Sequence, residues 1–312
     1  MSTARNIPSD RGLTLRMFTT GLLLVVLYGA VVGILIDVGL PAALVLGVAV
    51  ALLVAQYWFS DRVALFGMGG RLVTPEEEPQ LHGAIDRLCA MADMKKPAVA
   101  VADTDVPNAF ATGRSPDRAV VCATRGLLRR LDEPELEAVL AHELSHVAHR
   151  DVAVMTVASM LGVVAGLVTR MAMWSGMMGG FGGGRGGGNG RGSDQAAMVE
   201  LAVLAVSVVV YAISFVLTRT LSRYRELAAD RSGALLTGQP SVLASALVKV
   251  TGDLSRIPTR DLRATEGFNA FFFTPAIAGR GVSMATVFST HPPLDQRLAQ
   301  LARLEAQLGH AA

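Results

Sequence analysis

Two long runs without a charged side chain lie near the N-terminus, and they constrain the fold more than any other feature of this sequence. The runs cover residues 17–36 and 40–59, about twenty residues each. A helix of that length crosses roughly 30 Å, the thickness of the hydrocarbon core of a bilayer. Only Asp37, Val38 and Gly39 separate the runs. We therefore predict a transmembrane hairpin over residues 1–59.

Arginines flank this hairpin on one side only. Arg5, Arg11 and Arg16 precede it, Arg62 and Arg71 follow it, and the short turn contains no basic residue. Because positive residues are retained in the cytoplasm, we expect both ends of the hairpin to be cytoplasmic in a multi-pass protein of the cell membrane. The composition agrees, since 51% of the residues are hydrophobic and only 17% are charged.

Two further apolar stretches, residues 152–168 and 196–217, form a second hydrophobic segment. A glycine-rich, low-complexity link over residues 179–190 separates them. Either a full transmembrane hairpin or a shallow one is compatible with this pattern. We assign residues 152–217 to this hairpin, 60–151 to the first part of a cytoplasmic domain and 218–312 to its second part.

Charge and cysteine content exclude several classes of protein and site. The formal net charge is +2, and the 28 Lys and Arg residues form no basic face interleaved with aromatics, so we expect no nucleic acid partner. Cys89 and Cys122 are too few for a disulfide framework or a thiolate zinc cage. A metal bound here must take mainly nitrogen and oxygen ligands.

Residues 60–151 have the composition of a soluble domain. We predict a helix over residues 79–94 and short strands over residues 98–102 and 119–122. The segment 107–113, PNAFATG, is compatible with an edge strand beside a cleft or with a connecting loop. The predicted fold class is mostly α with a small β-sheet, combined with integral-membrane helices.

A helix predicted over residues 133–150 contains an HExxH motif. His142 and His146 are four residues apart, so one helical face presents both imidazoles to a single zinc ion. Glu143 lies beside them, where a carboxylate can take a proton from water at the metal. The apolar surroundings on this helix favour a shared function for the three residues over a chance match.

A catalytic zinc needs a third protein ligand, and Glu226 is the best candidate downstream. Asp230 follows it by four residues, so one carboxylate can bind the metal while the other accepts a hydrogen bond from a ligand imidazole. A solvated helix face paired with neighbouring arginines is the alternative. The upstream HExxH motif favours the metal site.

These motifs, in this order, resemble the HtpX family of membrane-bound heat-shock proteases, which are relatives of the CAAX prenyl proteases. The matching pieces are the N-terminal hairpin, segment 107–113, segment 142–146, the hydrophobic insertion, segment 226–230 and STHPP at 289–293. The resemblance covers nearly the whole chain and implies a zincin-like metallopeptidase domain. It also implies that His142, His146 and Glu226 bind Zn²⁺, that Glu143 is the catalytic carboxylate, and that the substrates are membrane or misfolded proteins in protein quality control and the stress response.

The remaining histidines are given other roles. We expect His82 and His310 at the surface and His149 in an interfacial position. His291 could donate a hydrogen bond to the tetrahedral oxyanion or serve only in helix entry and packing. Glu266 and His291 are the next candidates should Glu226 not bind the metal.

The predicted activity is a zinc-dependent endopeptidase whose partners are the lipid bilayer and protein substrates in or near it. The alternative is a membrane scaffold or chaperone with a structural zinc and no turnover, and the intact Glu143 argues against it. A transporter is disfavoured because the ionisable cluster lies outside the apolar runs.

Overall fold

The structure, a computed structural model, describes residues 11–37, 69–113, 115–150, 191–254 and 292–309, with a few single positions between 43 and 65. Contacts divide the chain into two compact units. The first unit comprises Met1–Leu15, Trp58–Ala153 and Leu221–Ala312, and the second comprises Arg16–Tyr57 and Val154–Thr220. The HExxH motif and Glu226 therefore lie in the same unit.

Two of the four predicted membrane segments are continuous helices. Residues 17–36 lie within α1 (Arg11–Asp37), and residues 196–217 lie within α7 (Arg191–Thr237). Over the residues that the structure describes, no helix is both long enough and apolar enough to qualify as a membrane span. Bilayer crossing therefore stays a prediction from the sequence. Most of run 40–59, and all of stretch 152–168 and the glycine-rich link, lie outside the described residues.

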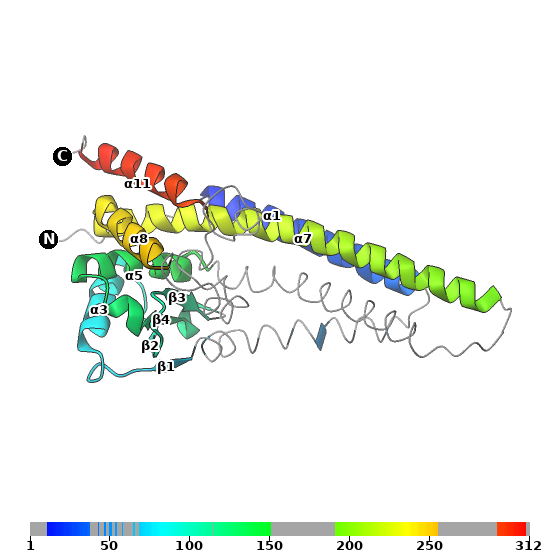
Figure 1. Ribbon diagram of the computed structural model, residues 1–312, viewed down its shortest axis with the longest axis horizontal. Helices are drawn as coiled ribbons and strands as arrows, with labels where there is room; N and C mark the ends of the chain where they lie inside the picture. The colour runs from blue at the N-terminus through cyan, green and yellow to red at the C-terminus, as the bar shows by residue number, and fades with distance from the viewer. Residues whose placement is uncertain are drawn as a thin grey trace. The chain divides into compact units, whose positions relative to one another are not determined.

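A four-stranded mixed sheet forms the base of the first unit, with the strand order β1-β2-β4-β3 (Figure 1). Strands β2 (Ala98–Ala102) and β4 (Val120–Thr124) are parallel, and β1 (Gly70–Leu72) and β3 (Ala109–Thr112) pair antiparallel on either side. Both predicted strands are confirmed, although β4 is shifted by one or two residues. Segment 107–113 contains an edge strand, which decides between the two alternatives left open by the sequence.

Helix α3 (Pro79–Ala92) ends two residues before the predicted boundary, because Asp93 adopts a left-handed conformation with φ 51°. The expectation that His82 lies at the surface is wrong. The residue is 7% exposed, and its Nε2 lies 3.1 Å from the carbonyl oxygen of Val73. The polar ring is buried with a backbone partner just after β1, as buried polar groups generally are.

Helix α5 (Glu133–Ala148) lies between the sheet and α8 (Pro240–Leu254), as Figure 1 shows. Its first turn is closed by a capping box in which Asp132 accepts from the backbone N–H of Glu135 and Glu135 accepts from that of Asp132. Glu135 is buried and also accepts hydrogen bonds from Ser245 and Lys249 of α8, at 2.7 and 2.6 Å. These contacts fix the start of α5 to α8.

A final helix, α11 (Leu294–Gly309), packs against α8. The core of the unit is formed by apolar side chains of the sheet, α3, α5, α8 and α11. The three predicted zinc-motif residues on α5 are buried beside this core rather than exposed on a surface helix.

Candidate metal centre

Helix α5 places His142, Glu143 and His146 on a buried stretch of its surface. The three residues are 0%, 3% and 5% exposed, respectively. The Nε2 atoms of the two histidines are 3.2 Å apart, and the rings meet edge to face at 88°. The four-residue spacing therefore brings both imidazoles to one point, as the sequence predicts.

Helix α7 brings Glu226 to the same point. One carboxylate oxygen lies 3.5 Å from Nε2 of His142, and the other lies 3.5 Å from Nε2 of His146. The three ligand atoms are all within 4.8 Å of one another. Two ligands of a tetrahedral zinc ion, each about 2.05 Å from the metal, lie about 3.3 Å apart, so this donor set fits a zinc ion.

Asp230 lies one helical turn beyond Glu226 on α7 and contacts the far side of His142. Its Oδ1 is 2.9 Å from Nδ1 of His142. A proton on Nδ1 shared with this carboxylate leaves the lone pair on Nε2 directed toward the metal position. The structure thus brings Glu226 and Asp230 to opposite sides of the His142 ring, and their roles stay predictions.

The charges in the site favour a cation. Burial opposes the positive charge on His142, but Asp230 and Glu226 outweigh it and raise the pKa of His142 to about 9. A divalent metal ion would interact favourably with the same carboxylates when the imidazoles are neutral.

A buried arginine completes the cluster, and the sequence interpretation did not include it. Arg297 of α11 is 1% exposed and donates two hydrogen bonds to the carboxylate of Asp230, at 2.7 and 2.6 Å. Burial raises the pKa of Asp230, but the charge and hydrogen bonds of Arg297 outweigh this and hold it below its usual value. The sequence does contain a signal, because Arg297 occupies the apolar stripe of its helix between Leu294 and Leu301.

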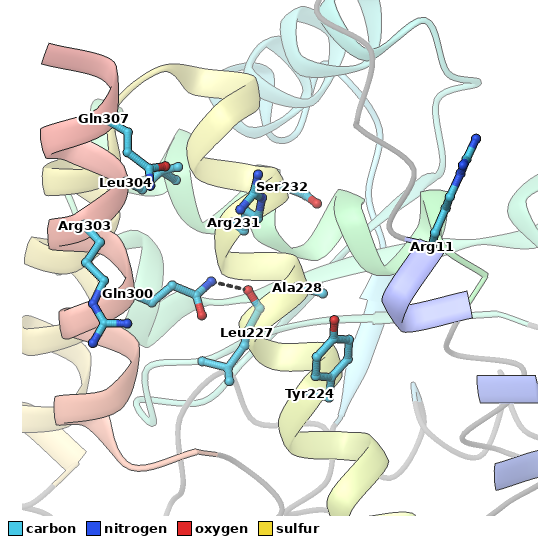
Figure 2. A pocket seen from close by; sticks show the side chains of 10 residues that line it. All are labelled: Arg11, Tyr224, Leu227, Ala228, Arg231, Ser232, Gln300, Arg303, Leu304 and Gln307. Carbon is cyan, nitrogen blue, oxygen red and sulfur yellow. Dashed lines mark hydrogen bonds between the residues drawn. The ribbon is translucent and has the colours of Figure 1, made fainter. Parts of the chain in front are cut away.

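A second contact holds α11 on α7. Gln300 donates a hydrogen bond of 2.6 Å to the carbonyl oxygen of Leu227, drawn as a dashed line in Figure 2. A hollow of about 720 Å³ lies beside this contact, and Arg11, Arg231 and Arg303 are among its lining residues. None of the metal-centre residues lines it. The hollow and the candidate metal centre are therefore distinct.

Glu143 faces the edge strand of the sheet. Burial raises the pKa of Glu143, whereas His142, His146 and a backbone hydrogen bond with Ala111 of β3 act in the opposite direction. In the part of the chain that the structure describes, no strand pairs with the outer edge of β3. The carboxylate predicted to act on water thus lies beside the edge strand of the described sheet.

The other predicted positions do not join this cluster. His149 is partly buried at the C-terminal cap of α5, one turn past the second histidine. His291, His310 and Glu266 lie outside the described residues, so the two roles weighed for His291 stay predictions.

The chain is similar to known proteins over most of its length. The profile of Peptidase family M48 matches residues 75–305. The chain is 59% identical over 304 residues to Protease HtpX homolog 1 of Streptomyces coelicolor, covering 97% of this chain and 96% of the relative. It is 49% identical over 305 residues to Protease HtpX homolog of Moorella thermoacetica, covering 97% and 98%.

The fold is similar to that of a solved structure. The crystal structure of S. mikatae Ste24p superposes with a TM-score of 0.52 at 18% sequence identity, over 94% of this chain and 67% of that one. At this identity the similarity concerns the fold alone.

Proposed function

The chain belongs to peptidase family M48 and is a metallopeptidase, and from this premise we propose that it is a zinc-dependent endopeptidase of the cell membrane with its active site on the cytoplasmic side. We further propose that it cleaves membrane or misfolded proteins in quality control. The observation that carries the proposal is the meeting of His142, His146 and Glu226, from two helices, beside the buried Glu143.

In this proposal His142, His146 and Glu226 hold the metal, and Asp230 with Arg297 orients His142. A bound zinc ion supplies Lewis acidity toward a peptide carbonyl and toward water. Nitrogen and oxygen donors in this number leave one tetrahedral position for water or substrate, which is typical of catalytic rather than structural zinc sites.

Glu143 acts as the general base. Its carboxylate takes a proton from the attacking water and passes it to the nitrogen of the leaving amine. The side chain is buried next to both histidines, so its position is set by the same helix that sets the two ligands. This proximity supports the assignment of Glu143 as the base.

The position of β3 at the edge of the described sheet supports an extended peptide as the substrate. A strand edge presents backbone N–H and C=O groups that an extended chain can pair with, largely independently of its side chains. Because Ala111 of β3 lies next to Glu143, a peptide paired there would pass the general base. Such pairing suits a protease with many protein substrates.

The membrane assignment rests on the uncharged runs and on the arginines that flank them. Helix α1 supports it, since it contains the first of these runs within a continuous helix, and α7 contains the hydrophobic stretch 196–217. A helical run satisfies its own backbone hydrogen bonds, which is the requirement for crossing hydrocarbon.

The decisive test is the substitution Glu143→Gln in the full chain in detergent. We expect cleavage of a casein-type substrate to be abolished, because an amide cannot act as a base. Zinc content should stay that of the parent, because the three ligands remain. Glu137→Gln on the same helix is the matched control, since Glu137 pairs with Arg87 away from the site, and it should retain both properties.

Cleavage by Glu143→Gln at a substantial fraction of the parental rate would refute the assignment of the base. A parent chain that binds zinc but cleaves no protein would instead favour the non-catalytic scaffold.

A further inference from the structure

Helix α7 touches the backbone of α5 at one glycine. A Cβ atom placed on Gly233 would lie 2.8 Å from the backbone nitrogen of His142 and 3.0 Å from its Cα. The carbonyl carbon of Ala141 would be only 3.1 Å away. The two helices therefore approach at the first metal-ligand residue as closely as a residue without a side chain permits.

Gly233 shares a helical face with the two acidic residues of the site. Asp230 follows Glu226 by four residues, and Gly233 follows Asp230 by three, so all three positions lie on one side of α7. Glu226 and Asp230 reach His142 from this face, at 3.5 and 2.9 Å. The backbone contact at Gly233 therefore lies on the same face of α7 as the two carboxylates that reach His142.

We propose that Gly233 is a positioning residue that sets the spacing between α5 and α7, and through it the size of the metal site. This inference rests on the proposed zinc site and adds a determinant of its geometry. Gly233 touches no reacting atom, and it acts by allowing α7 to lie directly on the backbone of His142.

The magnitude of the required shift supports this role. Atoms in ordinary van der Waals contact are about 3.5 Å apart, so a side chain at position 233 would separate the helices by about 0.5 to 0.7 Å. The obstructing atoms belong to the backbone, so no side-chain rotation can relieve the contact. Zinc–ligand distances tolerate only about 0.2 Å, so a shift of this size exceeds what the site can absorb.

Helix propensity predicts the opposite effect. Glycine inside a helix is unfavourable relative to alanine, so Gly233→Ala would stabilise α7 if spacing had no role. If spacing matters, Gly233→Ala weakens zinc binding. If only helix propensity matters, the same substitution raises the stability of α7.

The experiment compares Gly233→Ala with Gly252→Ala in the full chain in detergent. Gly252 lies in α8, where a Cβ atom would meet nothing within 4 Å, so this control changes helix propensity without a steric contact. Zinc affinity is measured by competition with a chelator. We expect Gly233→Ala to bind zinc about 10- to 100-fold more weakly than the parent, and Gly252→Ala to match it.

Two further measurements separate spacing from general damage. Cd²⁺, like Zn²⁺, has a filled d shell, and its radius is larger, so a widened site should lose less affinity for Cd²⁺ than for Zn²⁺. The buried thiols Cys89 and Cys122 report on the packing of the sheet and α3. In Gly233→Ala they should react with a thiol reagent as slowly as in the parent.

Parental zinc affinity in Gly233→Ala would overturn the inference and leave the proposed function intact. Equal losses for both metals, or thiols that become reactive together with the loss of zinc, would assign Gly233 to general packing and also overturn it. A parent that holds no zinc would refute the proposed metal site itself, so the two failures are distinguishable.

Discussion

Asp230 serves two partners at once, and this changes what its replacement should do. It contacts Nδ1 of His142 on one side and the guanidinium of Arg297 on the other, and all three groups are buried. From the sequence, Asp230→Ala is a mild change that weakens zinc binding or activity by about 10- to 100-fold. In the structure it also leaves a buried arginine without its carboxylate.

We therefore expect Asp230→Ala and Arg297→Ala each to lower stability by about 3 to 5 kcal/mol, because each leaves a buried charge uncompensated. The double variant Asp230→Ala/Arg297→Met should regain much of that stability, because it removes both charges and restores apolar volume. Thermal midpoints of the full chain test this, and a double variant less stable than either single variant would contradict it.

Glu226→Ala should act differently, because it removes a metal ligand rather than a supporting group. Two histidines then remain, and zinc affinity and peptidase activity should fall together. The measurement is zinc stoichiometry after dialysis against a weak chelator, set beside the cleavage rate. A Glu226→Ala chain that keeps zinc as the parent does would place the third ligand elsewhere, with His291 and Glu266 next to test.

At the scale of the elements, the start of α5 should matter more for stability than its exposed surface. Glu135 closes the capping box and accepts from Ser245 and Lys249, so its loss removes several hydrogen bonds to one buried carboxylate. We expect Glu135→Ala to destabilise the unit by about 1.5 to 3 kcal/mol.

Glu137→Ala is the control for this change, because Glu137 is partly exposed and pairs with the exposed Arg87. It should have a much smaller effect. Thermal exposure of the buried thiols is a suitable measurement, and equal shifts for the two variants would show that the link between α5 and α8 contributes little.

The elements that the sequence predicted well are those specified by local signals. Helix α5 begins at the predicted residue because Asp132, Pro134 and Glu135 form an N-terminal capping pattern. The two histidines follow from spacing on that helix. Strand β1 (Gly70–Leu72) was missed because three residues, one of them glycine, carry almost no strand signal and are ordered only by pairing with β2.

Contacts between distant segments were harder to predict. Segment 107–113 became a strand only through pairing with β4, which a single sequence does not reveal. The role of Arg297 likewise depends on a distant partner, since Arg297 lies 67 residues from Asp230. The burial of His82 was missed although its backbone partner Val73 is only nine residues away. Glu226 was found only because the chemistry of zinc requires a third ligand.

For the molecule as a whole, the predicted orientation in the membrane can be tested by labelling single cysteines with a thiol reagent. The structure indicates where the cytoplasmic cysteine should be placed. A cysteine at Gly113 would be a poor reporter, because Gly113 has φ 128° and its Cβ atom would lie 2.6 Å from the carbonyl oxygen of Arg118. Lys95, whose side chain is 68% exposed, is the better position. Gly39, the outer reporter, lies outside the described residues.

With Lys95→Cys and Gly39→Cys in separate chains, a thiol reagent that cannot cross membranes should label the cysteine at 39 in intact cells. It should label the one at 95 only after the cells are permeabilised. Labelling of Lys95→Cys in intact cells would reverse the orientation.

The native thiols serve as the internal control. Burial raises the pKa of Cys89 to about 11, with a smaller contribution from Asp86, and burial raises that of Cys122 to about 12. At neutral pH both stay protonated and unreactive, and their labelling should increase only as the pH approaches those values or the fold opens.

The first unit is built from separate stretches of the sequence. The residues of the candidate metal site are therefore synthesised at different times. His142 and His146 are made early, but Glu226 follows about 80 residues later, after the hydrophobic insertion, and Arg297 later still. At about 5 to 20 residues per second, the ribosome needs about 4 to 16 s to span the first of these gaps. We therefore expect the nascent chain to be inactive until α7 is complete, and a product truncated before α11 to lack the arginine that supports Asp230.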